Sequence, residues 1–310
     1  MPKGISLHIG LNHVDATAYG GWDGALAAAV HDAHDMALLA SSEAYRTQLL
    51  TDRQATATAV LTAIRTAGGK LRPGDVFLLS YSGHGGQLPD TIPEGGPSGF
   101  DETWVCWDRQ LLDDEVYAAL ASFARDVRVI VVSDTSHSGT NARSPLAPSP
   151  PVRTPEGARR ARIIPTAVSN ADQSRRQALY QRIRRSSRAE IRRAMARQRA
   201  LTRRQSDLRK PTSCLSARAV LLTACQDNEV AYDGPGNGAF TNALLTTWAT
   251  GRFEGTYRDF VSLIRTRLSA QTPGLLSIGR GATGWEASRP FTVDIRHDLE
   301  LIEDPGSQPD

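Results

Sequence analysis

The 310-residue chain has few cysteines and no long uncharged apolar run. Its three cysteines, Cys106, Cys214 and Cys225, are odd in number and lack metal-ligand spacing, which argues against a disulfide scaffold or a zinc site. No stretch reaches the roughly 18 apolar residues that a membrane span requires. The first twelve residues (MPKGISLHIGLN) lack the apolar run and cleavage site of a signal peptide. We therefore expect a protein of the reducing cytoplasm without a membrane partner.

Negative charge is scarce in one part of the sequence. Residues 153–210 contain 17 Arg and one Lys against four acidic residues, a net charge of +14, although the whole chain carries only +3. The other residues therefore carry a net charge of −11. The only aromatic residue of the basic stretch is Tyr180, which leaves little to stack on nucleic-acid bases. The sequence thus describes an acidic body that carries a basic insertion.

Apolar runs alternate with helical patterns along the rest of the chain. Strands are predicted at 5–12, 75–86 (running into a glycine-rich turn), 103–108, 127–134, 219–227 and 290–295. Helices are predicted at 23–45 (with Asp23 as N-cap), 55–67, 113–126, 239–250 and 256–269. Continuous apolar strands between helices indicate an α/β fold, with a mostly parallel sheet covered by helices on both faces. Chemistry in such sheets gathers beyond the carboxyl ends of the strands.

Residues 141–216 interrupt this alternation. The first part is rich in Pro and Ser and predicts an extended loop, and from about residue 172 the pattern becomes a basic amphipathic helix. Its apolar residues recur on an i, i+4 row: Leu179, Ile183, Ile191 and Met195. One interpretation is a binding site for a nucleic-acid or small-molecule regulator, and the other is a solvated helical insertion. We expect residues 1–140 and 217–310 to be the N- and C-terminal parts of one domain around this insertion.

Polar residues follow two of the predicted strands, in the motifs YSGHGGQ (81–87) and DTSHSGT (134–140). Neighbouring parallel strands lie about 4.8 Å apart, so His84 and Ser136 can meet above one sheet edge. A nucleophile beside a histidine base is the minimal unit of acyl transfer to water. The backbone N–H of Gly85 can approach a substrate carbonyl and stabilise an oxyanion. Taken alone, each motif is weak evidence, because a single histidine in a glycine turn is more often structural than catalytic.

The two motifs together resemble the catalytic motifs of the caspase-like cysteine peptidases, in particular metacaspases and prokaryotic caspase homologues. Further similarity lies in other segments, in the family's order: WDGALAAAVHDAHDM (22–36), FDETWVCWD (100–108) with DDE (113–115), LLTACQDNEVAYDG (221–234) and GAFTNALL (238–245). Together they cover most of the chain outside the insertion. The resemblance implies a caspase–hemoglobinase fold and an endopeptidase with a Cys–His dyad, in which His84 is the base. Prokaryotic relatives act in stress or defence responses.

The sequence departs from the family pattern at the nucleophile, where Ser136 stands in the place of a cysteine. A thiol ionises at about pH 8.5 and is easily activated by histidine, whereas a serine hydroxyl needs a stronger and better oriented base. Three explanations stay open: a deliberate Cys→Ser change that inactivates the enzyme, a natural pseudoprotease that binds basic peptides or a regulatory partner without cleavage, and a serine hydrolase. Cys225 lies in an apolar strand pattern, which is typical of a buried core thiol rather than a substitute nucleophile.

The resemblance also implies an acidic pocket that binds Arg or Lys before the scissile bond. The family's pocket residues fall on Asp32, Ser82 and Asp134. Two carboxylates that face a guanidinium give the bidentate, charge-assisted pairing that selects arginine. The expected partners are therefore protein or peptide substrates with Arg or Lys at this position. Taken alone, Asp32 fits a solvated charge on a helix.

Many metacaspases bind calcium, and Asp101, Asp113 and Asp114 match the first part of the family's ligand set. The acidic ligand expected after the nucleophile is missing, because residues 137–155 contain no Asp or Glu. Calcium prefers six or more oxygen ligands, so the set is incomplete. The alternative is that Asp113 and Asp114 form the acidic first turn of a helix.

The family commonly cuts itself after the catalytic cysteine during maturation. An arginine pocket would meet the tethered insertion at high effective concentration. The Pro- and Ser-rich stretch is the expected cut zone, because a peptide must be extended to enter a cleft; its arginines are Arg153, Arg159, Arg160 and Arg162. We expect an active form of the protein to cleave itself within residues 141–216.

Overall fold

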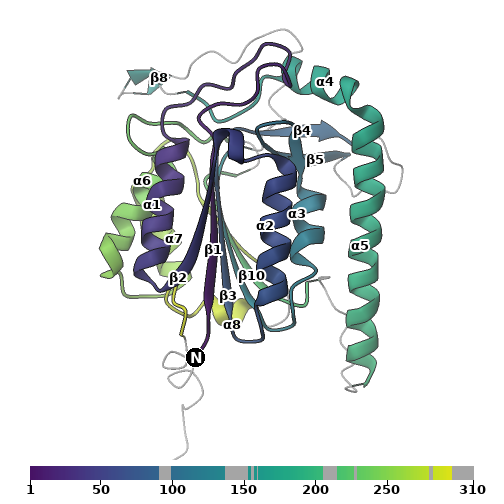
Figure 1. Ribbon diagram of the computed structural model, residues 1–310. Coiled ribbons are helices and arrows are strands. Elements are labelled where there is room, and N and C mark those ends of the chain that lie inside the picture. Colours follow the sequence, from purple (N-terminus) through teal and green to yellow (C-terminus); the bar gives the residue numbers. More distant parts are fainter. Residues whose placement is uncertain are drawn as a thin grey trace, which may run out of the picture.

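A six-stranded sheet forms the centre of the protein (Figure 1). The structure is a computed structural model that describes residues 1–90, 99–136, 160–204, 215–226, 229–278 and 282–294, and the backbone of two short strands, β8 (Arg153–Thr154) and β9 (Gly157–Ala158). The strand order is β11 (Gly274–Ile278), β10 (Arg218–Thr223), β7 (Arg128–Asp134), β3 (Val76–Ser82), β1 (Gly4–Gly10) and β2 (Tyr45–Thr51). All neighbouring pairs are parallel except β10 with β11.

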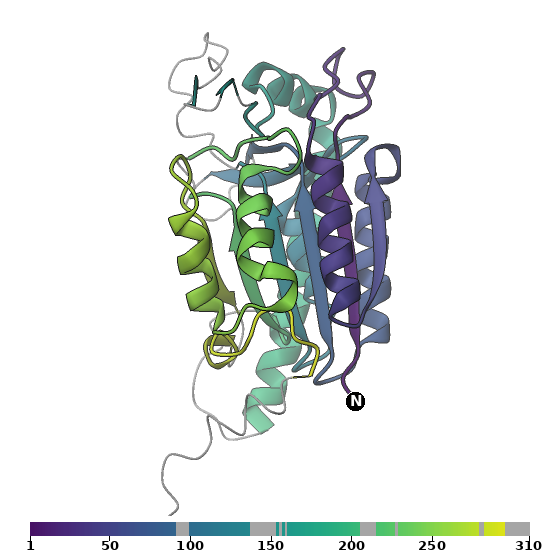
Figure 2. The same ribbon diagram turned by 90° about the vertical axis from the view of Figure 1, so that its left-hand side faces the viewer.

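Helices cover both faces of this sheet (Figures 1 and 2). One face carries α1 (Ala29–Ser42), α6 (Ala239–Trp248) and α7 (Tyr257–Thr266), and the other carries α2 (Ala57–Lys70) and α3 (Asp113–Leu120). Every residue of β3 and β7 is buried, as strands covered on both sides require. The predicted α/β fold with a mostly parallel sheet is therefore confirmed.

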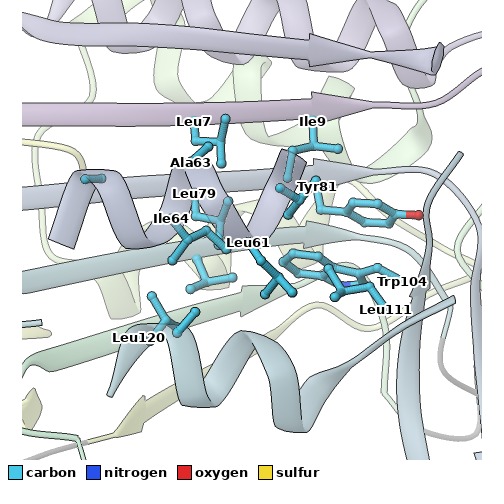
Figure 3. Close-up of a cluster of buried hydrophobic side chains, with 14 of the residues drawn as sticks. Leu7, Ile9, Leu61, Ala63, Ile64, Leu79, Tyr81, Trp104, Leu111 and Leu120 are labelled. Atoms are coloured by element: carbon cyan, nitrogen blue, oxygen red, sulfur yellow. The ribbon is translucent and has the colours of Figure 1, made fainter. Parts of the chain in front are cut away.

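The sheet separates two apolar cores, because successive side chains of a strand point to opposite faces. Leu7 of β1 and Leu79 of β3 pack with Ile64 of α2 in one core (Figure 3). Leu78 of β3 packs with Phe240 of α6 in the other. Burying a large apolar side chain stabilises a fold by about 1.5–3 kcal/mol. Packing on both faces holds the parallel strands in place, so that their carboxyl ends lie at the same edge of the sheet.

Helix α1 begins later than the sequence pattern predicts. The predicted start and N-cap, Asp23, precede α1 in a loop. The backbone N–H groups of Ala27 and Ala28 donate to the carboxylate of Asp233, at 2.6 and 3.1 Å. A residue more than 200 positions away in the sequence thus provides the acceptors that a local N-cap would provide. No local pattern could signal this.

The strand predictions also differ from the structure. Edge strand β2, antiparallel β11 and the short strands β4 (Gly85–Pro89) and β6 (Gln110–Leu112) were not predicted. Strand β4 pairs with β5 (Phe100–Val105), which pairs with β6, in a small sheet beside the central one. The strand predicted at 290–295 is wrong for its described part, since residues 290–294 form turns and bends. Phe291 there has a φ of 60°, which no strand allows. The remaining short helices are η1 (Asp52–Gln54), η2 (Ala249–Gly251) and α8 (Ala282–Trp285).

The insertion contains two helices, α4 (Thr166–Arg175) and the long α5 (Gln177–Arg204), which stands beside α3 (Figure 1). The basic helix was predicted, but its buried face was not. The predicted apolar row is only half-buried, whereas Tyr180, Arg184 and Ser187 are buried. Neither α5 nor another helix within the described ranges has the length and apolar character needed to cross a membrane.

A buried polar network joins the insertion to the small sheet. The Tyr180 hydroxyl donates to the Asp172 carboxylate at 2.5 Å and accepts from the backbone N–H of Gln110 at 3.2 Å. The Gln110 side chain donates to the same carboxylate at 3.1 Å. Each group is buried, so losing one partner leaves a desolvated polar atom without a hydrogen bond.

We expect Tyr180→Phe to lower the free energy of unfolding by about 1–3 kcal/mol, because it leaves the Gln110 N–H without this acceptor and removes one donor to the Asp172 carboxylate. Urea denaturation followed by circular dichroism measures the change. Tyr45→Phe is the matched control: the Tyr45 hydroxyl is buried without a hydrogen-bond partner among the described residues, so its removal should be neutral or stabilising. Equal losses in both variants would contradict the importance of the network.

Candidate active site

Two polar loops meet at the carboxyl edge of the sheet because β3 and β7 are parallel neighbours. The last residues of these strands, Ser82 and Asp134, are partners in the strand register. His84 lies two positions after β3, and Ser136 lies two positions after β7. The structure therefore brings both predicted catalytic residues to one edge of the sheet, where parallel strands commonly form sites.

His84 is a buried imidazole with one nitrogen held and the other free. Its Nε2 lies 3.0 Å from the carbonyl oxygen of Gly24. A carbonyl only accepts hydrogen bonds, so Nε2 carries the proton. Nδ1 has no hydrogen-bond partner among the described residues. The ring of Trp22 packs against the imidazole with centroids 4.9 Å apart and helps to fix its orientation.

Burial lowers the pKa of His84 to about 4, although its hydrogen bond to Gly24 raises it. His84 is therefore neutral at neutral pH, with the Nδ1 lone pair available to accept a proton. The backbone of Ile163 also raises the pKa of His84. A base in this state suits an acidic thiol better than an alcohol.

Ser136 is completely buried, and its hydroxyl is held by the backbone rather than by the histidine. The Oγ atom accepts a hydrogen bond from the Ala231 N–H at 2.7 Å. In the part of the chain that the structure describes, this hydroxyl makes no hydrogen bond to His84. The predicted nucleophile and base thus share the site without being linked in this conformation.

Residues 160–162 cross the site in an extended conformation and pair with the segment after β10. The Arg162 N–H donates to the Ala231 carbonyl at 3.0 Å, and the Asp233 N–H donates to the Arg160 carbonyl at 2.9 Å. Adding an extended peptide to a strand-like edge is a common mode of peptide recognition. The insertion therefore lies in the site as a peptide ligand would.

The carbonyl oxygen of Arg162 faces two backbone N–H groups. It lies 3.0 Å from the nitrogen of Gly85 and 3.3 Å from that of Ser136. Two converging N–H donors can stabilise an oxyanion that forms on this carbonyl. A Cβ atom at Gly85 would lie 2.2 Å from the Ser136 carbonyl oxygen, so only glycine permits this approach. The predicted oxyanion residue is thus in contact with the peptide.

The side chain of Arg162 fills a pocket formed by the three residues predicted to bind substrate. Its guanidinium lies 2.6 Å from an Asp32 carboxylate oxygen, 3.0 Å from Asp134 and 2.6 Å from the Ser82 hydroxyl. The guanidinium is 0% exposed. The structure thus brings the three residues of the predicted pocket together around one guanidinium, whereas the sequence did not indicate which of the 17 arginines of the basic stretch would lie there.

Asp233 also lines the pocket, although the sequence did not indicate it. Its carboxylate lies 3.1 Å from the Arg162 guanidinium, and it also accepts the two N–H groups at the start of α1. It therefore joins the pocket to the helix that carries Asp32. The segment AYDG was noted only for its family resemblance, and nothing in it separates Asp233 from an ordinary turn aspartate.

The electrostatic environment of the pocket favours a side chain that is always positively charged. Burial raises the pKa of Asp134 above its ordinary value, while Arg162 opposes and Asp32 adds to that shift. Burial alone would lower the pKa of Arg162, but Asp134, Asp32 and Asp233 together raise it. Three buried carboxylates thus favour a group that stays charged and offers several donors, which describes a guanidinium.

The residues predicted as calcium ligands lie in a different environment. Asp101 contacts Arg184 of α5 at 2.5 Å, and Asp114 contacts Arg188 at 3.0 Å. The Asp113 carboxylate accepts the backbone N–H of Asp114 at 2.9 Å. Across the described ranges, no group of three or more acidic, histidine or cysteine side chains could hold a metal ion. Arg184 and Arg188 are thus the positively charged partners of Asp101 and Asp114.

Comparison with known proteins identifies the family. The model of the caspase domain matches residues 3–284. The solved structure of protein GSU0716 from Geobacter sulfurreducens is 37% identical, covers 94% of this chain and 99% of that chain, and superposes with a TM-score of 0.77. Metacaspase-1 of Candida albicans is 24% identical over 222 residues, which are 66% of this chain and 47% of the relative. Metacaspase-6 of Arabidopsis thaliana is 36% identical over 69 residues, 22% of this chain and 19% of the relative.

The sheet with a histidine and a nucleophile position at neighbouring strand ends defines a caspase-like peptidase fold. Because the family model spans more than half of the sequence, the chain belongs to the caspase domain family. The predicted resemblance to metacaspases is confirmed. The chain spans less than half the length of these two curated relatives.

We expect the His84 imidazole to titrate at about pH 4, below the value of 6.5 for a free histidine, and to carry its proton on Nε2 above that pH. Long-range ¹H–¹⁵N spectra of the Ser136 protein measure both the tautomer and the titration. Assignment comes from the signal that disappears in His84→Gln. A titration near 6.5, or an Nδ1–H tautomer, would contradict the arrangement described here.

Proposed function

We propose that this chain is a caspase-like endopeptidase of the metacaspase type that cleaves after Arg or Lys, and that its Ser136 form is inactive. One observation carries the proposal: the chain's own Arg162 occupies the acidic pocket while its carbonyl faces two backbone N–H donors. An extended peptide held in this way has the geometry of a peptidase substrate. The scissile bond would be Arg162–Ile163.

The site chemistry favours a thiol at position 136. The neutral His84, with a pKa of about 4, is a weak base for an alcohol. The Ser136 hydroxyl is also engaged with the Ala231 N–H rather than with the histidine. A cysteine needs less activation, because its thiol loses a proton far more readily. The serine therefore binds the peptide without attacking it.

With cysteine at 136, the reaction would proceed by acyl transfer. The thiolate attacks the Arg162 carbonyl carbon, and the negative charge on the oxygen is stabilised by the N–H groups of Gly85 and residue 136. The proton of the thiol passes through His84 Nδ1 to the nitrogen of Ile163, which leaves as an amine. Water then hydrolyses the thioester and restores the thiol.

The first test is self-cleavage of the Ser136→Cys protein. We expect intact-mass analysis to find two fragments, residues 1–162 and 163–310, because Arg162 already lies in the pocket. Adding His84→Ala should keep the chain whole, because no base then remains for the thiol.

The matched control separates Arg162 from its neighbours. Arg162→Ala in the cysteine form should abolish the cut at residue 162, whereas Arg160→Ala should leave it intact, since the exposed Arg160 side chain donates to the Ala25 carbonyl outside the pocket. A fully folded Ser136→Cys protein that stays one chain and hydrolyses no Arg peptide would favour the alternative, a pseudoprotease that binds basic peptides.

The second test concerns specificity. In the cysteine form, Asp32→Asn, Asp134→Asn and Asp233→Asn should each lower kcat/KM for Arg peptides by a factor of tens to thousands, because removing one partner of a desolvated charge pair costs about 2–5 kcal/mol. Steady-state kinetics with Arg, Lys and Asp peptides measure the effect. Asp35→Asn is the matched control on α1, since Asp35 contacts Asn237 and not Arg162. Faster cleavage after Asp than after Arg would refute the specificity.

A further inference from the structure

Helix α5 has one face that packs on the body and an opposite face that is rich in exposed arginines. It stands at the outside of the molecule, beside α3 (Figure 1). On the inner face Tyr180, Arg184 and Ala194 are buried, and Ile183 packs beside them against Leu88. An α-helix turns about 100° per residue, so the exposed, described arginines of α5 lie on the other side, within an arc of about 140°: Arg182, Arg185, Arg192, Arg193 and Arg197.

These five arginines, the arginine stripe, carry positive charge that the body does not neutralise. Arg184 and Arg188 pair with aspartates of the body, whereas no arginine of the stripe forms an ion pair with a residue that the structure describes. The acidic residue of α5, Glu190, is already paired with Arg65 of α2 at 3.1 Å. Salt screens exposed charges beyond about 10 Å at 0.1 M, so acidic residues farther away on the body offset the stripe little.

The dimensions of the stripe suit a regular row of phosphates. From Arg182 to Arg197 the helix rises about 22 Å, at 1.5 Å per residue. Duplex DNA carries one negative charge per about 1.7 Å of its axis, and guanidinium groups bind phosphate oxygens with two hydrogen bonds. The residues between the arginines on this face are small, which lets a phosphate backbone approach closely: Ser186, Ala189 and Ala196.

The same face is poorly suited to two other polyanions. Single-stranded nucleic acids bind where aromatic side chains stack on their bases, but Tyr180, the aromatic residue of α5, is buried with its hydroxyl on Asp172. A helix that binds a membrane surface inserts an apolar face among the lipids. In α5 the apolar face is turned to the body, where Ile183 packs against Leu88 and Leu112. The exposed face therefore offers positive charge without base stacking or lipid insertion.

We propose that the arginine stripe of α5 is a binding surface for the phosphate backbone of duplex DNA, without sequence specificity. Base sequence is read inside a groove, and a helix whose other half packs on the body cannot enter a groove deeply. Duplex RNA is recognised largely through the 2′-hydroxyls of its minor groove, for which this face has few hydrogen-bonding groups besides arginine. The pocket around Arg162 contains no residue of α5, so the DNA surface and the pocket are separate sites.

The test titrates a short, fluorescently labelled DNA duplex with the full-length Ser136 protein and follows its anisotropy. We expect a Kd of about 1–100 μM at physiological salt, which is the range of non-specific DNA binding. If three to five phosphates are neutralised, the affinity falls about 40- to 500-fold between 50 and 200 mM salt, with a slope of about −3 to −5 in a plot of log K against log salt.

A pair of double variants locates the surface. Arg185→Gln with Arg192→Gln removes two charges of the stripe, so it should weaken binding at 50 mM salt by about tenfold or more and reduce the slope by about 2. The matched control is Arg46→Gln with Arg252→Gln, which removes the same charge from β2 and from the residue after η2. It should leave both values unchanged. All four arginines are exposed, so neither change disturbs the core.

The outcomes are separate from the question of catalysis, because every measurement uses the uncleaved Ser136 protein. Failure to bind the duplex at 50 mM salt overturns the proposal, and so does equal weakening by the stripe variant and the control. Tighter binding to single-stranded DNA or to duplex RNA of the same sequence also overturns it. Tighter binding to vesicles of phosphatidylcholine and phosphatidylserine would identify the stripe as a membrane contact instead.

Discussion

The arrangement of the site depends on the ion pairs that the Arg162 guanidinium forms with three carboxylates. The guanidinium lies among carboxylates from three separate segments, α1, the end of β7 and the loop after β10, and all of them are buried. Without a cation, these carboxylates would repel one another and take up protons. The same contact pulls the Arg162 carbonyl against the Gly85 and Ser136 N–H groups. The residue that neutralises the three carboxylates is therefore also the residue whose carbonyl is held by the two N–H groups.

The opposite net charges of the body and the basic stretch help to attach the insertion to the body, which composition alone does not show. The body carries a net charge of −11 and the basic stretch +14. Part of that positive charge is buried: Arg162 in the pocket, and Arg184 against Asp101 and its neighbours. The insertion is attached to the body by a few specific ion pairs, while other arginines of α5 remain exposed.

The sequence predicts the parts of the site that depend on strand ends. His84, Ser82, Asp134 and Ser136 follow two apolar runs, and parallel strands must bring such positions together. Family resemblance was needed to assign the pocket to Asp32, Ser82 and Asp134, and the helix that carries Asp32 reaches these strand ends only through the fold. The sequence gives the net charge of the basic stretch, but it does not indicate which of its arginines is buried in the pocket. Asp233 and the late start of α1 were missed for a related reason, because the helix is capped by a residue distant in sequence.

The orientation of His84 has a consequence for how the site tolerates mutation. The acceptor for Nε2–H is the main-chain carbonyl of residue 24. Every amino acid has that oxygen, so no side-chain substitution at this position deletes the acceptor. The residue there is glycine with a φ of 62°, a conformation that most L-residues adopt only with strain. At position 24 the shape of the loop therefore matters rather than a side-chain functional group, and a substitution there can displace the acceptor of the His84 hydrogen bond but cannot remove it.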